Sequence, residues 1–372
     1  MNKKNFDVVV DIGIEQITSC SFFKDSDTIN YSNKFSFNKK DNLNFELKND
    51  IVENLIFDIE KNNKEHLNEI LLMTDLSKMT PVSFNVFKKS NHLVIDKKLI
   101  NHLILEAKQE ISHNYKDYEI LHIVIVSYKI DDGVYRELPE NIKCEKISIE
   151  LIFINFSKEY LNLIKKPFNE SNISIRKVIC SSFAKSNFYS KKLDYDGQVG
   201  FIDIGYDKTS LFYFDKKKFN NYQIIPIGSK HITSDISKIF KIDLITAEEI
   251  KANFDNASFI NKNKNYNFEL IKEVIFSRIE EILELSTKIF KDQNNLDKIK
   301  LIFFGSGSKI LDNKFKRNIS FDQNIDLLDE EDLDVCKAGL NLFKDESSQE
   351  VEIISKNHDP KGIFEKFFNL FR

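Results

Sequence analysis

The chain has 372 residues, of which 41% are apolar and 30% charged, a composition typical of a soluble globular protein with room for two cores. Its formal net charge of -4 gives no basic field, which argues against nucleic acid as a partner. The cysteines form no CxxC pair and the histidines show no metal-ligand spacing. No signal peptide and no apolar run near ~20 residues is visible, so the sequence predicts a cytoplasmic protein.

A strand–Asp-x-Gly–strand pattern occurs twice. In 7–23 an apolar run ends at Asp11 and Gly13, and a second apolar run follows. One such segment alone is more typical of an ordinary hairpin turn. The pattern returns around Asp203 and Gly205. Because glycine lets the backbone approach an anion while a carboxylate reaches a metal, the repetition predicts two phosphate-binding hairpins in a duplicated fold.

Apolar periodicity predicts the remaining elements. In chain order they are a strand at 34–37, a helix at 49–62, a strand at 69–73, a helix at 99–111, strands at 119–128 and 143–156, a helix at 158–171, a hairpin at 200–214, a strand ended by Gly228, a helix opening at 233–235, a helix at 269–293, a strand at 300–304 and a helix at 334–343.

The segment 225–236 reads Ile-Pro-Ile-Gly-Ser-Lys-His-Ile-Thr-Ser-Asp-Ile. It resembles the I-P-V-G-G-x-H-x-T-x-D-I segment of FtsA, the bacterial cell-division actin homologue. The two hairpins are similar to those of the wider actin, sugar-kinase and chaperone-ATPase superfamily. Further segments follow in the order of the FtsA family from about residue 7 to residue 372. The resemblance implies an α/β, actin-like (RNase H-like) fold with two domains around a nucleotide cleft.

The resemblance also implies a division of the chain into subdomains. The expected units are a first actin-like subdomain (1–82 plus 176–197), an inserted FtsA-type subdomain (83–175), a second actin-like subdomain (198–236 plus 297–344), a smaller subdomain (237–296), a flexible tether (345–360) and an amphipathic membrane-targeting helix (361–372). The insert matches the family at Ile120-Leu-His122, Tyr128 and Asp132-Gly133 but lacks the glycines expected after Pro139. In the family this subdomain makes contacts along a protofilament.

The cofactors that the resemblance implies are ATP and Mg²⁺. Asp11 and Asp203 would hold the metal through water, and the amide end of the helix after Gly228 would face the cleft. The residues implied for the nucleotide are Asp11, Asp203, Gly13, Gly205, Gly228 and Thr209 at the phosphates, Glu248 and Lys251 at the ribose and adenine, and Gly305 and Gly307 at the adenosine.

Both hairpins depart from the family pattern. Residues 203–210 replace D-I-G-G-G-T-T-D by Asp-Ile-Gly-Tyr-Asp-Lys-Thr-Ser, and 14–16 replace T-S-K by Ile-Glu-Gln. Tyr206 and Asp207 restrict the approach of a phosphate, and Lys208 is a candidate compensating cation. The departures leave two alternatives, a weakened ATP site with at most weak ATPase activity or a degenerate cleft kept for shape.

Several polar residues have an alternative structural role. A surface salt bridge explains Glu248 and Lys251 as well as ribose contact does, since they share a helix face. His231 is either part of the start of its helix or a support for packing, and the structural role is favoured. His122, a lone histidine beside a strand, is better explained as structural than as catalytic.

On a helix, residues 361–372 would form one wide apolar stripe with polar residues opposite it or at its edges. Residues 345–361 are polar and read as a tether, and no helix after them is long enough to span a bilayer. An interfacial membrane anchor explains the stripe better than docking onto the body. The residues implied at the membrane are Ile363, Phe364, Phe367, Phe368, Leu370 and Phe371, with Lys366 and Arg372 beside them.

The resemblance implies a cell-division adaptor that tethers filaments of FtsZ to the inner membrane. Its implied partners are the FtsZ C-terminal tail, bound near 237–296, anionic inner-membrane lipids, further copies of itself in filaments, and downstream divisome proteins. It would act peripherally on the cytoplasmic face at the division site. Alternatives are a pilus-assembly actin homologue, a nucleotide-free scaffold, and a sugar-kinase-like enzyme, for which the sequence offers no substrate acid.

Overall fold

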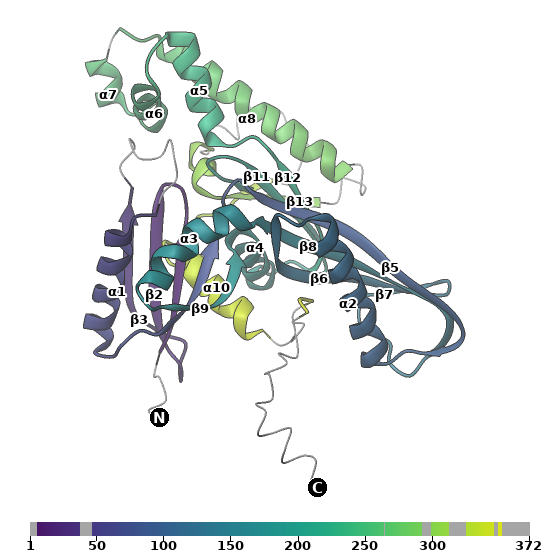
Figure 1. The fold of residues 1–372 in the computed structure, drawn as a ribbon. Helices are drawn as coiled ribbons and strands as arrows, with labels where there is room; N and C mark the ends of the chain where they lie inside the picture. The colour runs from purple at the N-terminus through teal and green to yellow at the C-terminus, as the bar shows by residue number, and fades with distance from the viewer. Residues whose placement is uncertain are drawn as a thin grey trace.

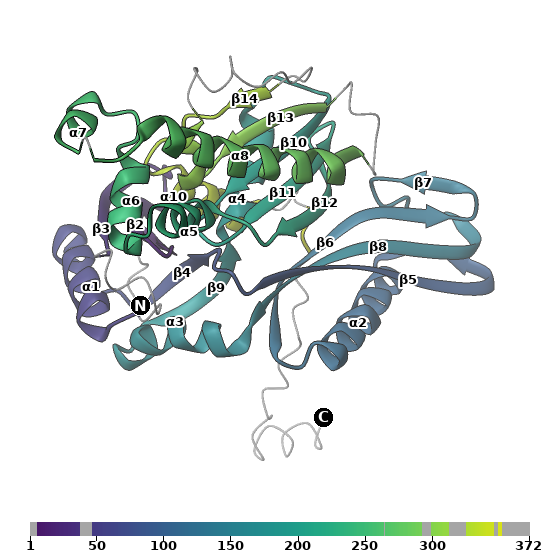
Figure 2. The same cartoon turned by 90° about the horizontal axis from the view of Figure 1, so that it is seen from above.

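The computed structural model describes residues 6–37, 47–263, 265–291, 299–311, 325–345 and 349–351. These residues form two five-stranded sheets and one four-stranded sheet. The four-stranded sheet projects to one side of the two larger sheets (Figures 1 and 2).

The first sheet is built on the N-terminal hairpin, and its strand order is β3-β2-β1-β4-β9. Its strands are β1 (Phe6–Ile12), β2 (Gln16–Phe23), β3 (Ile29–Ser36), β4 (Glu69–Thr74) and β9 (Ser174–Cys180). The first three strands are antiparallel, whereas β4 runs parallel to both β1 and β9.

The second sheet repeats this plan in the order β12-β11-β10-β13-β14. Its strands are β10 (Gln198–Ile204), β11 (Thr209–Asp215), β12 (Lys218–Ile225), β13 (Ile299–Phe304) and β14 (Ile325–Leu327). Again three antiparallel strands are followed by two parallel ones. The predicted duplication is therefore confirmed at the level of strand order and direction.

The tips of the two hairpins have the same turn geometry. The amide of Gly13 donates to the carbonyl of Gln16 at 3.0 Å, and the amide of Gly205 donates to the carbonyl of Lys208 at 2.9 Å. In each hairpin the acid lies one residue before the end of the paired strand segment. The repeated Asp-x-Gly pattern thus corresponds to a repeated structure.

Four helices accompany the first sheet. They are α1 (Asn49–Asn63), α3 (Lys158–Glu170), α4 (Ser181–Lys192) and α10 (Asp334–Lys344). Helices α4 and α10 pack against each other, and α4 also contacts β10 and β11 of the second sheet. An apolar cluster continues from the first sheet through these helices to Phe201, Phe212 and Phe304, which ties the two large sheets together.

The helices beside the second sheet lie together at one end of the molecule (Figure 1). They are α5 (Ser229–Phe240), α6 (Leu244–Ala252), α7 (Ala257–Lys262) and α8 (Phe268–Lys291). The predicted stripe of α8 is buried at Ile271, Ile275, Ile279 and Ile282, which follow helical spacing. This face packs into the second core cluster with Ile202.

The four-stranded sheet has the order β5-β8-β6-β7 and is covered by α2 (Lys97–Asn114). Its strands are β5 (Met79–Val94), β6 (Tyr118–Ile130), β7 (Gly133–Tyr135) and β8 (Lys143–Ser157). The sequence did not predict β5. Among the described strands β5 pairs only with β8, and exposed polar residues such as Ser83 and Asn85 interrupt its apolar pattern.

The helix predicted to open at 233–235 begins earlier, at Ser229, and Gly228 is its N-cap. The reason is local, because the Nδ1 atom of His231 accepts a hydrogen bond from the amide of Gly228 at 3.0 Å. Of the two alternatives for His231, this contact supports a place at the helix start. The preceding strand, β12, ends at Ile225 rather than at the glycine.

Part of the predicted tether lies against the body. Glu350 forms an antiparallel bridge with Val124 of β6, and the side-chain amide of Gln349 donates to the carbonyls of Ile125 and Phe219 at 2.8 Å and 3.0 Å. The expectation of a free tether is therefore wrong for 349–351, which fill an edge of β6 left open by its neighbours. The amphipathic segment 361–372 lies outside the described residues.

His122 has the structural role predicted for it. Its Nδ1 atom lies 2.8 Å from a carboxylate oxygen of Glu350, and its Nε2 atom accepts from the amide of Cys180 at 2.9 Å. Lys177 on β9 lies 2.9 Å from the same oxygen.

The described helices include none long and apolar enough to cross a membrane.

Candidate functional site

The two hairpin tips face one cleft of about 350 Å³. Its lining includes Asp11, Gly13, Asp203 and Gly205 of the predicted site. It does not include Thr209, Gly228, Glu248, Lys251, Gly305 or Gly307. The fold therefore brings the two Asp-x-Gly motifs together, and the other predicted nucleotide residues are not part of the cleft lining.

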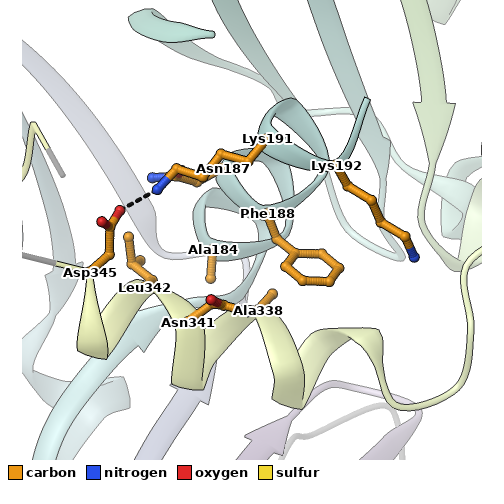
Figure 3. Close-up of a pocket in the computed structure, with 9 residues that line it drawn as sticks. All are labelled: Ala184, Asn187, Phe188, Lys191, Lys192, Ala338, Asn341, Leu342 and Asp345. Atoms are coloured by element: carbon orange, nitrogen blue, oxygen red, sulfur yellow. Dashed lines mark hydrogen bonds and ion pairs between the residues drawn. The ribbon is translucent and has the colours of Figure 1, made fainter. Parts of the chain in front are cut away.

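A second hollow, of about 250 Å³, lies between α4 and α10 (Figure 3). Figure 3 shows Phe188 and Leu342 beside it and the Lys191–Asp345 ion pair at one end. It lacks converging acidic groups of the kind that line the cleft between the hairpins. The cleft is consequently the better candidate site.

Asp11 lies at the end of β1 and is held by helix α4. The hydroxyl of Ser181 donates to its carboxylate at 2.5 Å. Burial raises the pKa of Asp11 to about 6, against an ordinary value of 3.8, although the bond from Ser181 and the charge of Lys185 oppose this. A carboxylate with this pKa is partly protonated near neutral pH.

The equivalent acid of the second hairpin, Asp203, has a lysine partner. The Nζ atom of Lys185 is 3.1 Å from Asp203 and 3.0 Å from Glu330. Burial raises the pKa of Asp203, and the ammonium opposes that rise. Burial alone would lower the pKa of Lys185, but the two carboxylates raise it, so Lys185 is charged. The amide of Gly305 donates to Glu330 at 2.7 Å and fixes it there.

A second ion pair crosses between the two large sheets. The Nζ atom of Lys208, at the tip of the second hairpin, lies 2.6 Å from the carboxylate of Asp75, directly after β4. The Lys208 side chain is only 5% exposed, and its Nζ atom lies 3.4 Å from the hydroxyl of Tyr222. Lys208 is thus a cation at the cleft, as the sequence suggested, but its charge is already neutralised by Asp75.

The amide end of α5 does not face the cleft, contrary to the prediction. The first amides of the helix, those of Ser229 and Lys230, donate to the carbonyls of Gly205 and Tyr206 at 2.9 Å each. A Cβ atom on Gly228 would lie 2.5 Å from the Tyr206 carbonyl, so the glycine is needed for this contact. The helix end therefore binds the hairpin tip rather than presenting free donors to an anion.

Thr209 and the adenosine-side glycines also have internal partners. The Thr209 hydroxyl donates to the carbonyl of Ile227 at 2.7 Å instead of facing the cleft. Gly305 has φ +93°, and a Cβ atom there would lie 2.1 Å from the Asp203 carboxylate. Gly307 packs against the side chain and carbonyl of Ile204. These residues let the chain after β13 lie close against β10.

Glu248 and Lys251 form an ion pair at 2.7 Å, as one alternative predicted, but the pair is not at the surface. The Lys251 side chain is 7% exposed and donates to the hydroxyl of Thr233 at 2.9 Å. That hydroxyl donates to Glu248 at 2.5 Å. The network joins α6 to α5 and lies outside the lining of the cleft.

Four residues that shape the cleft were not predicted as site residues, namely Asp75, Ser181, Lys185 and Glu330. Three of them had a usable signal in the sequence. Asp75 follows β4 directly, and the carboxyl ends of neighbouring parallel strands meet at one sheet edge. Ser181 and Lys185 are four residues apart, which places them on one face of α4.

The residues present do not fit a Mg²⁺ ion between Asp11 and Asp203. Mg²⁺ requires near-octahedral oxygen ligands at about 2.0–2.1 Å. Here a buried ammonium group lies against Asp203 and Glu330, and Ser181 holds Asp11. Among the residues that the structure describes, no three His, Cys, Asp or Glu side chains are grouped so as to hold a metal.

Comparison with known proteins finds sequences and folds that are similar to this chain. A family model described as "Cell division protein FtsA" matches residues 201–304, which extend from β10 to β13. The cell division protein FtsA of Buchnera aphidicola subsp. Schizaphis graminum is 25% identical over 184 residues, 45% of this chain and 44% of that protein. FtsA of Bacillus subtilis is 22% identical over 209 residues, 52% of this chain and 47% of that protein. The matched region thus spans about half the length of these relatives.

Solved structures extend the likeness over most of the chain. A structure titled "PilM-PilN type IV pilus biogenesis complex" covers 89% of this chain and 89% of its own, with a TM-score of 0.62 and 14% identity. The ethanolamine utilization protein EutJ from Carboxydothermus hydrogenoformans covers 92% and 90%, with a TM-score of 0.50 and 13% identity. These likenesses concern the fold alone. The chain is thus similar to the cell division protein FtsA over about half its length, and it has an actin-like fold.

Proposed function

We propose that this protein acts in cell division as an adaptor that holds FtsZ filaments at the cytoplasmic face of the inner membrane. The observation that carries the proposal is the FtsA match over 201–304, because it coincides with the second hairpin and helices α5 to α8. The proposed subdomains are those expected from the sequence, except that residues 349–351 lie against the body. The insert at 83–175 would mediate self-association into filaments. Downstream divisome proteins would be recruited to the same site.

The proposed FtsZ-binding surface lies on α5, α6 and α8, within 237–296. Four large apolar side chains are exposed there, at Ile239, Leu244, Ile245 and Leu270. Such a group suits the apolar side chains of a short peptide. Fluorescence anisotropy with a labelled FtsZ C-terminal peptide tests this surface.

The expected result is saturable peptide binding by the wild-type protein and at least about tenfold weaker binding by Ile239→Asp or Leu244→Asp. Phe87→Asp provides the matched control, since Phe87 is equally apolar and 65% exposed but lies on β5. Equal affinity in all four proteins would contradict the surface. Absence of binding by the wild type would contradict the adaptor function itself.

We also propose that the cleft takes a nucleotide. The support is the pair of equivalent hairpin tips, with Gly13 and Gly205 both lining a cleft of about 350 Å³. Isothermal titration with ATP tests this site. A dissociation constant in the micromolar to millimolar range is expected, and loss of binding in Gly205→Val would place ATP between the hairpins.

A nucleotide-free scaffold is the second candidate, and specific contacts favour it. Lys208 is paired with Asp75, and the first amides of α5 are paired with the second hairpin. Groups that could hold phosphates are thereby satisfied internally. If ATP gives no heat and no thermal shift at millimolar concentration, the scaffold replaces the nucleotide-binding form of the proposal.

A further inference from the structure

One positive charge is fixed at the place where the acidic groups of the cleft meet. The Nζ atom of Lys185 is 3.1 Å from Asp203 and 3.0 Å from Glu330, and the Lys185 side chain is 12% exposed. The same ammonium lies 4.7 Å from the centre of the Phe304 ring, within cation–π range. Two carboxylates and one aromatic ring therefore hold the ammonium group of Lys185 in place.

Helix α4 delivers this charge as part of a pair of contacts. Ser181 and Lys185 are one turn apart on the same helix face. Ser181 donates to Asp11 of the first hairpin, and Lys185 pairs with Asp203 of the second. One helix face thus supplies a partner to the acid of each hairpin, which is what a shared cation would otherwise do.

The surroundings keep the ammonium in place. Glu330 is held by the amide of Gly305 at 2.7 Å, and α4 is packed between the two large sheets. A divalent ion entering between the hairpins would have to displace a buried, doubly paired ammonium or lie against its charge. Both are unfavourable, because breaking a buried pair leaves an uncompensated charge.

We propose that the ammonium group of Lys185 takes the place of a divalent metal ion in this cleft. It neutralises Asp203 and Glu330 and supplies the fixed positive charge that an entering anion meets. In consequence the wild-type cleft does not bind a divalent ion, and a nucleotide that binds there does so without Mg²⁺. The statement about nucleotide rests on the proposed function, whereas the statement about the metal does not.

The absence of divalent-ion binding is tested by titrating the full-length protein with Mn²⁺ alone and measuring the concentration of free Mn²⁺ by electron paramagnetic resonance. No bound Mn²⁺ is expected for the wild type at Asp203. Lys185→Met should gain one site, because Asp203 and Glu330 lose their cation, and the added Asp203→Asn change should abolish it. Lys34→Met is the matched control, since Lys34 lines the same cleft but pairs with the exposed Asp332 at 2.8 Å.

The proposal is overturned if the wild type binds one Mn²⁺ that Asp203→Asn removes. It is equally overturned if folded Lys185→Met, verified by circular dichroism, binds none. Should Lys185→Met fail to fold, the wild type and Asp203→Asn still decide the question.

The nucleotide statement is tested by measuring ATP affinity in excess Mg²⁺ and in EDTA. The two dissociation constants of the wild type should agree within about twofold. Binding that requires Mg²⁺ would overturn the proposal. Failure to bind ATP in either condition would instead contradict nucleotide binding, and the Mn²⁺ titration would still judge the role of Lys185.

Discussion

At the scale of single residues, the charges of the cleft are paired with one another. Lys208 and Asp75 connect the tip of the second hairpin to the end of β4, and Lys185 connects α4 to Asp203 and Glu330. Such pairs are costly to break singly, because the remaining charge stays buried. The cleft can thus hold its shape through its own side chains.

The Lys208–Asp75 pair gives the first stability prediction. Lys208→Met should lower the free energy of unfolding by about 3 kcal/mol, because Asp75 is left without its cation in a partly buried position. Adding Asp75→Asn should restore part of this loss, with a coupling of about 1–3 kcal/mol. Urea unfolding of the four proteins measures it.

Lys300→Met is the control for that cycle. Lys300 pairs with Asp326 at 2.7 Å, but Asp326 is 48% exposed, so about 0.5 kcal/mol is expected. If Lys208→Met and Lys300→Met lower the free energy of unfolding equally, the buried pair does not contribute more to stability than the exposed one.

Glu350 gives a pH-dependent prediction. Burial alone would raise the pKa of Glu350, but its contact with His122 and the charge of Lys177 lower it to about 2, against an ordinary value of 4.5. A depressed carboxyl pKa stabilises the fold above pH 4.5, and this stabilisation is lost as the pH falls from 4.5 toward 2. It corresponds to roughly 3 kcal/mol at neutral pH.

Glu350→Gln should therefore lower the free energy of unfolding by about 3 kcal/mol at pH 7 and by progressively less below pH 4.5. Glu119→Gln, which removes an exposed pair with Lys165, serves as the control. Urea titrations at several pH values give the comparison. A difference between Glu350→Gln and wild type that stays constant down to pH 3 would contradict the assignment.

At the scale of elements, apolar periodicity predicted those helices and strands whose formation depends on nearby residues. The hairpins at β1–β2 and β10–β11 followed from apolar runs around Asp-x-Gly, and α8 followed from its isoleucine stripe. β5 was missed because one of its faces is exposed, so its sequence is not continuously apolar. Pattern alone could not place Lys185 opposite Glu330, because 145 residues separate them and only the tertiary fold brings them together.

The contact between the second hairpin and α5 gives the prediction at this scale. Gly228→Ala should destabilise the protein by about 2 kcal/mol or more, because the new Cβ would meet the Tyr206 carbonyl at 2.5 Å. Gly13→Ala is a matched control in the first hairpin, where the nearest atom is 3.3 Å away. Thermal unfolding should separate the two variants, and equal midpoints would contradict the close contact.

At the scale of the whole molecule, residues 349–351 join all three sheets. Gln349 bonds to Ile125 of the four-stranded sheet and Phe219 of the second sheet, while Glu350 pairs with Lys177 of the first. The last described residues of the chain lie at this junction. Any force on the segment that follows, where the sequence predicts a membrane-binding stripe, would first act on these buried contacts.

In the proposed function, one molecule of this protein holds an FtsZ peptide at a membrane. The most direct test is co-sedimentation of the full-length protein with anionic liposomes and a labelled FtsZ C-terminal peptide. We expect protein and peptide to pellet together, Phe367→Glu/Phe368→Glu to leave both in solution, and Ile239→Asp to pellet without the peptide. If the wild-type protein stays in the supernatant, or pellets and leaves the peptide behind, the adaptor function is contradicted.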